Sequence, residues 1–104
     1  MNFQAKFAIG QTIQHLLFDY RGVIYDVDPV FLGTEEWYEQ VARSRPPKDE
    51  PWYRVLVDGS DHETYVAQRN LEADPSGDPV LHPLTSQFFS KFQEGSYVPK
   101  RLVS

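Results

Sequence analysis

The sequence predicts a small, mainly β domain, in which about five antiparallel strands form a strongly bent, partly open barrel that carries two short helices. Three observations lead to this fold class. Apolar and polar residues alternate over several short runs, as half-buried strands require. Clusters of glycine, proline and aspartate separate these runs and indicate turns. The chain has 104 residues, which suits one domain over residues 1–104 and not two.

The first two predicted strands form a hairpin that follows a short N-terminal extension. The first strand covers 12–17, and the segment FDYRG at 18–22 supplies the turn. The second strand is RGVIYDVD at 21–28, where one face is apolar and the other becomes polar toward the end. Pro29 ends this strand because proline has no backbone N–H to donate to a neighbouring strand.

A short helix is predicted next, from Thr34 to about Arg43. Thr34 is a suitable N-cap, and the two glutamates after it lie near the positive end of the helix dipole. Trp37 and Val41 are four residues apart and therefore share one face. The segment 43–51 contains three prolines and mixed charges, which indicates an exposed loop.

Two further strands are predicted in the second half of the chain. PWYRVLVDG at 51–59 alternates between two faces, and its closing Asp-Gly begins a tight connection. The fourth strand covers 63–68, and residues 70–72 form a turn or a short strand. The segment 73–79 is a loop because it is rich in proline, glycine and aspartate.

The C-terminal part predicts a second helix followed by an irregular tail. Leu84, Phe88 and Phe92 recur every four residues and form one apolar stripe. Thr85 or Ser86 could cap this helix, and Gly95 could end it. The tail GSYVPKRLVS shows no regular pattern.

Composition limits the classes of function. Fifteen acidic and ten basic residues give a net charge of −5, which argues against a strong general DNA binder and suits a partner of proteins. The chain has no cysteine, so disulfides and thiolate metal sites are excluded. The N-terminus does not resemble a secretory signal, and no stretch approaches the roughly 20 apolar residues of a membrane helix. We expect a cytoplasmic protein that does not contact a membrane.

Catalytic and metal-binding patterns have little support. The three histidines, His15, His62 and His82, do not lie at ligand spacing on a predicted helix. No nucleophile or phosphate-loop motif occurs. Asp26 and Asp28 share one strand face and could bind a divalent cation or share a proton, although a solvent-facing strand end is the simpler interpretation. We expect no enzyme activity and no cofactor.

Residues that could contact a partner lie in the loops and the tail. These candidates for DNA or protein binding are Arg43, Arg45, Lys48, Tyr97, Lys100 and Arg101. The five cations could bind phosphate or an acidic protein surface. The simpler interpretation is that they are solvated loop charges, and Asp49 and Glu50 offset the cations of the proline loop.

The chain is rich in aromatic residues. Its fifteen Phe, Tyr and Trp side chains exceed what a core of this size needs. Trp52, Tyr97 and the stripe of Leu84, Phe88 and Phe92 are candidates for an exposed patch, and such patches mark interfaces, including self-association. The alternative is that these residues simply fill the core.

A resemblance to a known family covers most of the chain. The blocks KFAIGQTIQHLLFDYRGVIYDVDPVF, PWYRVLVDG and TYVAQRNL, together with Trp37 and the closing pattern HPL...FF..F....Y.P, carry it. In order and spacing they resemble the YccV-like family of hemimethylated-DNA-binding domains, also called the HspQ family of heat-shock proteins. The resemblance runs from Lys6 to about Lys100.

This resemblance implies an SH3-like β-barrel with added helices, and it implies homotrimers in at least some members. It also implies two activities. The first is binding of the ATP-dependent protease Lon, which enhances degradation of selected substrates and is linked to degradation of the replication initiator DnaA. The alternative is binding of hemimethylated DNA at the replication origin. The family motif implies no catalytic residue, and we expect regulation of Lon before DNA binding.

Overall fold

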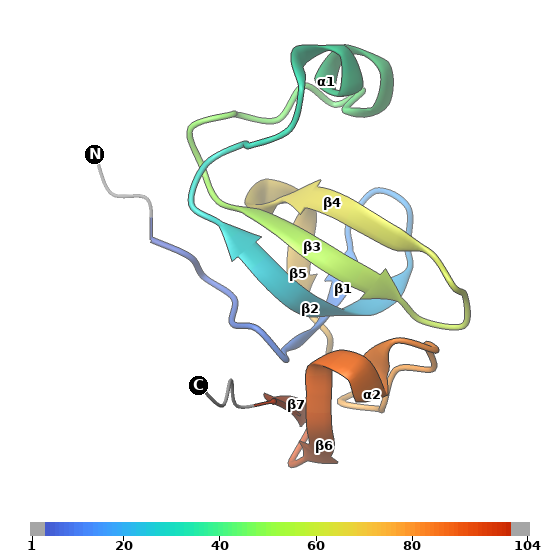
Figure 1. Cartoon of the computed structure of the whole chain (residues 1–104). Coiled ribbons are helices and arrows are strands. Elements are labelled where there is room, and N and C mark those ends of the chain that lie inside the picture. Colours follow the sequence, from blue (N-terminus) through green and yellow to red (C-terminus); the bar gives the residue numbers. More distant parts are fainter. Residues whose placement is uncertain (1–3, 101–104) are drawn as a thin grey trace.

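The computed structural model describes residues 4–100 and shows a mainly β fold with two short α-helices (Figure 1). The elements in chain order are β1 (Thr12–His15), β2 (Arg21–Asp28), α1 (Glu35–Val41), β3 (Trp52–Val57), β4 (Glu63–Ala67), the 3-10 helix η1 (Gln68–Asn70), β5 (Leu71–Ala73), α2 (Thr85–Phe88), β6 (Phe89–Gln93) and β7 (Ser96–Pro99). Five strands form one antiparallel sheet in the order β4-β3-β2-β1-β5. Over the described residues β4 and β5 do not pair, so the barrel is partly open, as predicted.

A β-bulge bends the centre of this sheet. Ile24 of β2 pairs with Val55 of β3, but the next pair joins Asp26 to Arg54, so Tyr25 is an extra residue on β2. A bulge of this kind increases the local twist and bends the strand. The bend lets β2 and β3 curve around one core while Tyr25 faces the outside of the barrel.

The interior of the barrel receives side chains from all five strands of the large sheet. The buried residues of this cluster are Ile13, Ile24, Tyr53, Val55, Val66 and Leu71. Each fully buried aliphatic side chain contributes about 1.5–3 kcal/mol to folding. The alternation predicted for the strands therefore places one face of each strand in a common core.

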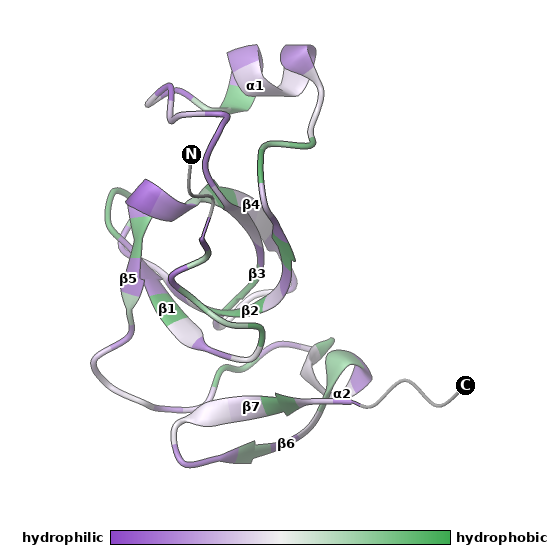
Figure 2. Ribbon diagram, turned by 90° about the vertical axis from the view of Figure 1, so that its left-hand side faces the viewer, coloured by the Kyte–Doolittle hydropathy of each residue, from purple (hydrophilic) through white to green (hydrophobic). Residues whose placement is uncertain are grey.

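The outer face of β2 and β3 is covered at both ends. At one end the residues between β2 and β3, which include α1, bury Tyr38, Trp52 and Ala67 in a second cluster. At the other end the C-terminal segment covers Val23 and Leu56. The two covering units lie at opposite ends of the barrel (Figures 1 and 2). Trp52, which was a candidate for an exposed patch, is instead buried core.

The C-terminal region corrects the sequence prediction. The expected helix through Phe92 ends at Phe88 after one turn, and a hairpin of β6 and β7 follows. Glu94 and Gly95 both have positive φ, 53° and 80°, which matches the two-residue turn that favours strand pairing. Residues 96–99 of the tail, expected to be irregular, form β7.

The N-terminal half differs less from its prediction. The first strand ends at His15 and not at Leu17, while the second strand has its predicted bounds. The first helix ends at Val41, two residues earlier than expected. The predicted cap is confirmed because the Thr34 side chain accepts a hydrogen bond of 3.1 Å from the backbone N–H of Trp37.

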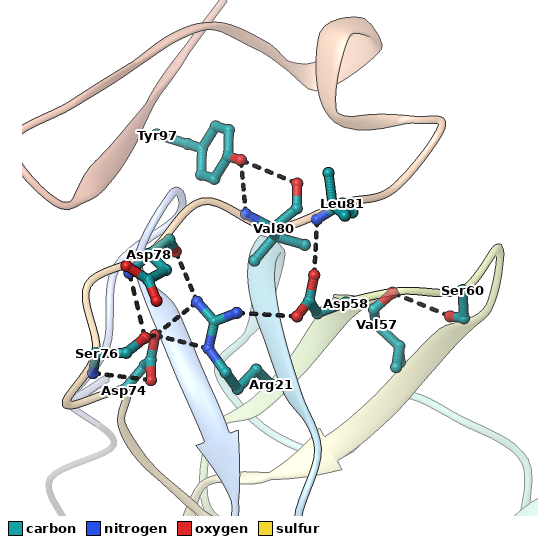
Figure 3. A network of polar contacts seen from close by, with 10 residues as sticks. All are labelled: Arg21, Val57, Asp58, Ser60, Asp74, Ser76, Asp78, Val80, Leu81 and Tyr97. Carbon is teal, nitrogen blue, oxygen red and sulfur yellow. Dashed lines mark hydrogen bonds and ion pairs between the residues drawn. The ribbon is translucent and has the colours of Figure 1, made fainter.

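The C-terminal hairpin is joined to the barrel through backbone and polar contacts. The N–H of Tyr97 donates to the carbonyl of Gly10 at 2.8 Å, and Gln11 forms a β-bridge with Ser96. The Tyr97 hydroxyl also bonds both backbone groups of Val80 (Figure 3). Within residues 4–100 no helix is long and apolar enough to cross a membrane.

Candidate binding groove and basic loops

A groove of about 470 Å³ follows the outer edge of β4. It lies where the β1–β2 turn, the C-terminal end of α1 and the edge strand meet. Leu17 and Phe18 line it from the turn, and Trp37 and Val41 line it from the helix. Leu17, Phe18 and Val41 are exposed large apolar side chains. The lining is therefore largely apolar and open to solvent.

His15 shapes the turn that presents these side chains. Its Nδ1 accepts hydrogen bonds from the backbone N–H groups of Leu17 and Phe18, both at 3.1 Å. An Nδ1 that accepts in this way is unprotonated, and burial lowers the pKa of His15. With both N–H groups turned inward, the side chains of Leu17 and Phe18 remain 57% and 72% exposed.

A hydroxyl pair connects the same turn to the edge strand. The Tyr20 and Thr64 hydroxyls lie 2.7 Å apart, and burial raises the pKa of Tyr20 despite this hydrogen bond. The pair crosses the open side of the barrel, where β4 has no neighbouring strand. It ties the turn that forms one wall of the groove to β4.

The backbone of β4 presents unpaired groups to the groove. The N–H of Val57 donates to the carbonyl of His62, and the N–H of Gln68 donates to that of Pro51. With the register of the two strands, these bonds show that the even-numbered residues of β4 direct their backbone N–H and C=O groups toward β3. The N–H and C=O groups of the odd-numbered residues, 63, 65 and 67, point outward and have no hydrogen-bond partner among residues 4–100.

Tyr65 anchors the middle of the groove to the sheet. Its hydroxyl donates to Asp28 at 2.6 Å and accepts from the N–H of Leu32 at 3.1 Å. Burial, followed by the hydrogen bond to Asp28, raises the pKa of Tyr65 to about 12. The Arg54 guanidinium lies over the Tyr65 ring, 4.6 Å from its centroid.

The carboxylates of Asp26 and Asp28 belong to this anchor. Arg54 lies 3.8 Å from Asp26 and 3.5 Å from Asp28. The simpler sequence interpretation placed both on a solvent-facing strand end, which is wrong for Asp28 because its side chain is nearly buried. Among the described residues no group of three or more His, Asp or Glu side chains is arranged to hold a metal ion.

Tyr25 and Glu63 form the end of the groove nearest the C-terminal segment. The Tyr25 hydroxyl donates to Glu63 at 2.5 Å, and burial together with this carboxylate raises the pKa of Tyr25. The Tyr25 ring stacks on Phe88 of α2, with centroids 4.7 Å apart. A carboxylate therefore marks this end of the groove.

The basic residues of the proline loop have different environments. Arg45 pairs with Glu39 at 2.8 Å, and Lys48 pairs with Glu35 at 2.6 Å while lying over the Tyr38 ring. These two cations brace α1 against the loop that follows it. Arg43 is exposed, lines the groove and forms no ion pair with any residue in 4–100.

The remaining candidates lie at the other end of the molecule. The Tyr97 ring packs on Phe89 and Phe92, and its hydroxyl is bonded to Val80, so this residue holds the hairpin. Lys100 is exposed just after β7. Arg101 lies outside the described residues. The structure therefore does not bring the six candidate residues together.

Sequence reasoning missed the groove itself. One signal could have revealed it: Leu16, Leu17 and Phe18 form an apolar run where the strand alternation stops and a turn begins. Three consecutive apolar residues in an exposed turn are unusual unless they serve an interface.

Fold and site together define a small mainly β domain with an open apolar groove along one sheet edge. The chain matches the family model described as hemimethylated DNA-binding protein YccV like, over residues 5–96. This chain belongs to the YccV-like family. The resemblance carried by the sequence blocks is thereby confirmed.

Proposed function

We propose that this protein is a cytoplasmic, non-catalytic heat-shock regulator that binds the ATP-dependent protease Lon and enhances degradation of selected substrates, DnaA among them. The observation that carries the proposal is the set of exposed apolar residues Leu17, Phe18 and Val41 beside the unpaired edge of β4. Apolar side chains beside free backbone groups suit a polypeptide partner. The net charge of −5 also favours a protein partner over a polyanion.

Activation of a protease requires differential binding. The regulator must bind the active state of Lon more tightly than the inactive state. With equal affinity for both states, it would leave the equilibrium between them unchanged. We propose that the protein acts as a homotrimer, because three grooves on one particle would raise the avidity for a target with several binding sites without any new contact.

The test is a titration of this protein into Lon with a folded substrate and ATP. We expect the initial rate of substrate degradation to rise and then saturate. Phe18→Ala should weaken the effect, whereas Leu81→Ala, an equally exposed apolar residue outside the groove at 75% exposure, should not. An unchanged rate for several substrates, DnaA included, would contradict the proposal.

A shortened chain tests whether the tail docks on Lon. The cut must follow Lys100, because a cut after Glu94 removes β7 and the bonds between Tyr97 and Val80. If the chain that ends at Lys100 retains full activity, the tail is not the docking element. Loss of activity with an unchanged melting temperature would assign docking to residues 101–104.

Binding of hemimethylated DNA is the second candidate function, and the family match over residues 5–96 favours it. Arg43 is the cation best placed to contact a phosphate, since Arg45 and Lys48 pair with glutamates. If Arg43 supplies most of the phosphate contact, the dependence of affinity on salt should be shallow, about 0.9 log units per phosphate contact.

The matched measurement uses three duplexes of one sequence that are hemimethylated, fully methylated or unmethylated, over a range of salt. We expect Arg43→Ala to reduce affinity and to lower the salt slope by about one contact. Arg45→Ala serves as the control. Weak and equal binding to all three duplexes would leave only electrostatic contact and would reject methylation-specific recognition.

A further inference from the structure

We propose that the groove binds an extended polypeptide segment as an added strand, antiparallel to β4. The segment has an acidic residue at its N-terminal end, apolar residues in its middle and a basic residue at its C-terminal end. This inference rests on the proposed function, in which the partners are proteins. It adds where such a partner binds and which sequence pattern it carries.

The backbone of β4 is the first argument. Its outward groups at Glu63, Tyr65 and Ala67 have no partner among residues 4–100, and an unpaired edge is a template for another strand. Natural edges are commonly protected by lysine, proline or a bulge. β4 reads ETYVA and pairs with β3 in an uninterrupted register, so it carries none of these three devices.

The side chains around this edge are the second argument. Successive side chains of a strand point to opposite faces of its sheet. A strand added to β4 would therefore meet Leu17 and Phe18 on one face, and Trp37 and Val41 on the other. The two apolar walls favour apolar residues at the central positions of the segment.

The charges at the two ends are the third argument. Glu63 is the first residue of β4 and lines the groove there. Arg43 also lines the groove, and its neighbour Ser44 accepts a hydrogen bond of 3.2 Å from Asn70, three residues beyond the end of β4. The edge therefore runs from a carboxylate to a guanidinium. An antiparallel segment complements it with a basic residue near Glu63 and an acidic residue near Arg43.

Two other occupants fit less well. The phosphates of a nucleic acid would meet the carboxylate of Glu63 at one end of the groove, and the Arg54 guanidinium that also lines it is already paired with Asp26 and Asp28. In a second copy of this chain, β5 also lies at an edge of the sheet, but with three residues it is too short to fill the groove.

The probe is the acetylated and amidated peptide Glu-Val-Leu-Leu-Val-Lys, titrated into the isotope-labelled protein and followed by amide exchange. We expect the amides of Glu63, Tyr65 and Ala67 to exchange rapidly in the free protein and to become protected on binding. The amides of Thr64 and Val66, which already bond β3, should change little. Methylation of the alternate peptide nitrogens that face β4 should abolish binding, whereas methylation of the other set should be tolerated.

Charge exchange tests the orientation. The peptide of reversed order, Lys-Val-Leu-Leu-Val-Glu, should bind at least fivefold more weakly. A variant carrying both Arg43→Glu and Glu63→Lys should prefer the reversed peptide, whereas Lys91→Glu, which lies on β6, should leave the original preference unchanged.

The results separate this inference from the proposed function. Protection of the outward β4 amides by the peptide supports the inference whether or not Lon responds. If neither peptide protects these amides, if a DNA duplex protects them instead, or if raising the protein concentration alone protects them, the inference is rejected. A normal response of Lon to the protein in that case leaves the proposed function standing with its site elsewhere.

Discussion

The Arg21 guanidinium on β2 lies 2.8 Å from the carboxylate of Asp74, the residue that follows β5 (Figure 3). Arg21 also bonds Asp58 at 2.9 Å and the backbone carbonyl of Asp78 at 2.6 Å. The Asp74 side chain is 1% exposed. Burial alone would raise the pKa of Asp74, but the hydrogen bonds from Arg21 and Ser76 outweigh it and hold this pKa below its usual value. The Arg21 side chain thus ties the segment between β5 and α2 to the barrel.

Asp74→Asn should lower the free energy of unfolding by about 2 kcal/mol, because a buried hydrogen bond between charged groups is lost and Arg21 keeps its charge. Urea denaturation measures this as a shift of the midpoint. Asp78→Asn is the control, since Arg21 contacts only the backbone of that residue. Equal midpoints for the two variants would show that the Asp74 carboxylate contributes nothing.

The Asp74 carboxylate also makes the free energy of unfolding depend on pH in the acidic range. The folded pKa of Asp74 lies below its unfolded value, so its contribution is full above about pH 4 and is lost as the pH falls through the folded pKa. Wild type should therefore lose more stability than Asp74→Asn between about pH 4 and pH 2. Parallel pH curves for the two proteins, measured by thermal unfolding, would contradict this assignment.

His15 should control stability in a different pH range. Its folded pKa lies below the unfolded value of about 6.5, so its contribution is full above that pH and is lost as the pH falls toward the folded pKa. His15→Asn can keep an acceptor near the Nδ1 position and does not titrate. We expect the variant to lose less stability than wild type between pH 7.5 and pH 5. His62 and His82 are present in both proteins, so the difference isolates His15.

Tyr20→Phe should reduce stability by about 1 kcal/mol, because it removes the hydroxyl contact with Thr64 across the open side of the barrel. A double-mutant cycle with Thr64→Val isolates this contact from other effects of each substitution. We also expect faster amide exchange in β4. Strictly additive losses would show that the two hydroxyls do not interact.

Gly10→Ala should destabilise the joint between the barrel and the C-terminal hairpin. Gly10 has a φ of 93°, and a Cβ there would overlap the backbone carbonyl of Tyr97. Left-handed strain costs roughly 1–2 kcal/mol, and the overlap adds to it. Gly77→Ala is the matched control, because its φ is also positive, 66°, but a Cβ meets open space. Similar unfolding midpoints for both variants would argue against close packing at Gly10.

The sequence predicted the strands β2, β3 and β4, and their predicted and observed bounds agree within one or two residues. Each of these short runs is rich in apolar residues that fill the barrel core. The cap of α1 could also be predicted, since it depends on Thr34 and its immediate neighbours. Local sequence patterns predict secondary structure correctly where it depends on residues that are close in sequence.

The C-terminal region could not be predicted in the same way. The spacing of Leu84, Phe88 and Phe92 matches a helix, but Phe89 between them is the residue buried against Val23 and Leu56. That burial comes from contacts distant in sequence, which override the local period. The groove was missed for the same reason, because its walls come from the β1–β2 turn, α1 and β4. The basic residues were predicted as a group, but their ion pairs depend on how α1 and its loop meet.

The bridge between Gln11 and Ser96 affects how the chain folds during its synthesis. Translation proceeds from the N-terminus, so Gln11 is made long before its pairing partner. Contacts between residues that are distant in sequence slow folding, because the chain between them must close into a loop before the contact can stabilise the fold. Until β6 and β7 emerge from the ribosome, Val23 and Leu56 lack their cover and present apolar surface of the kind that promotes aggregation and that chaperones protect. Completion of this fold therefore waits until β6 and β7 have been synthesised.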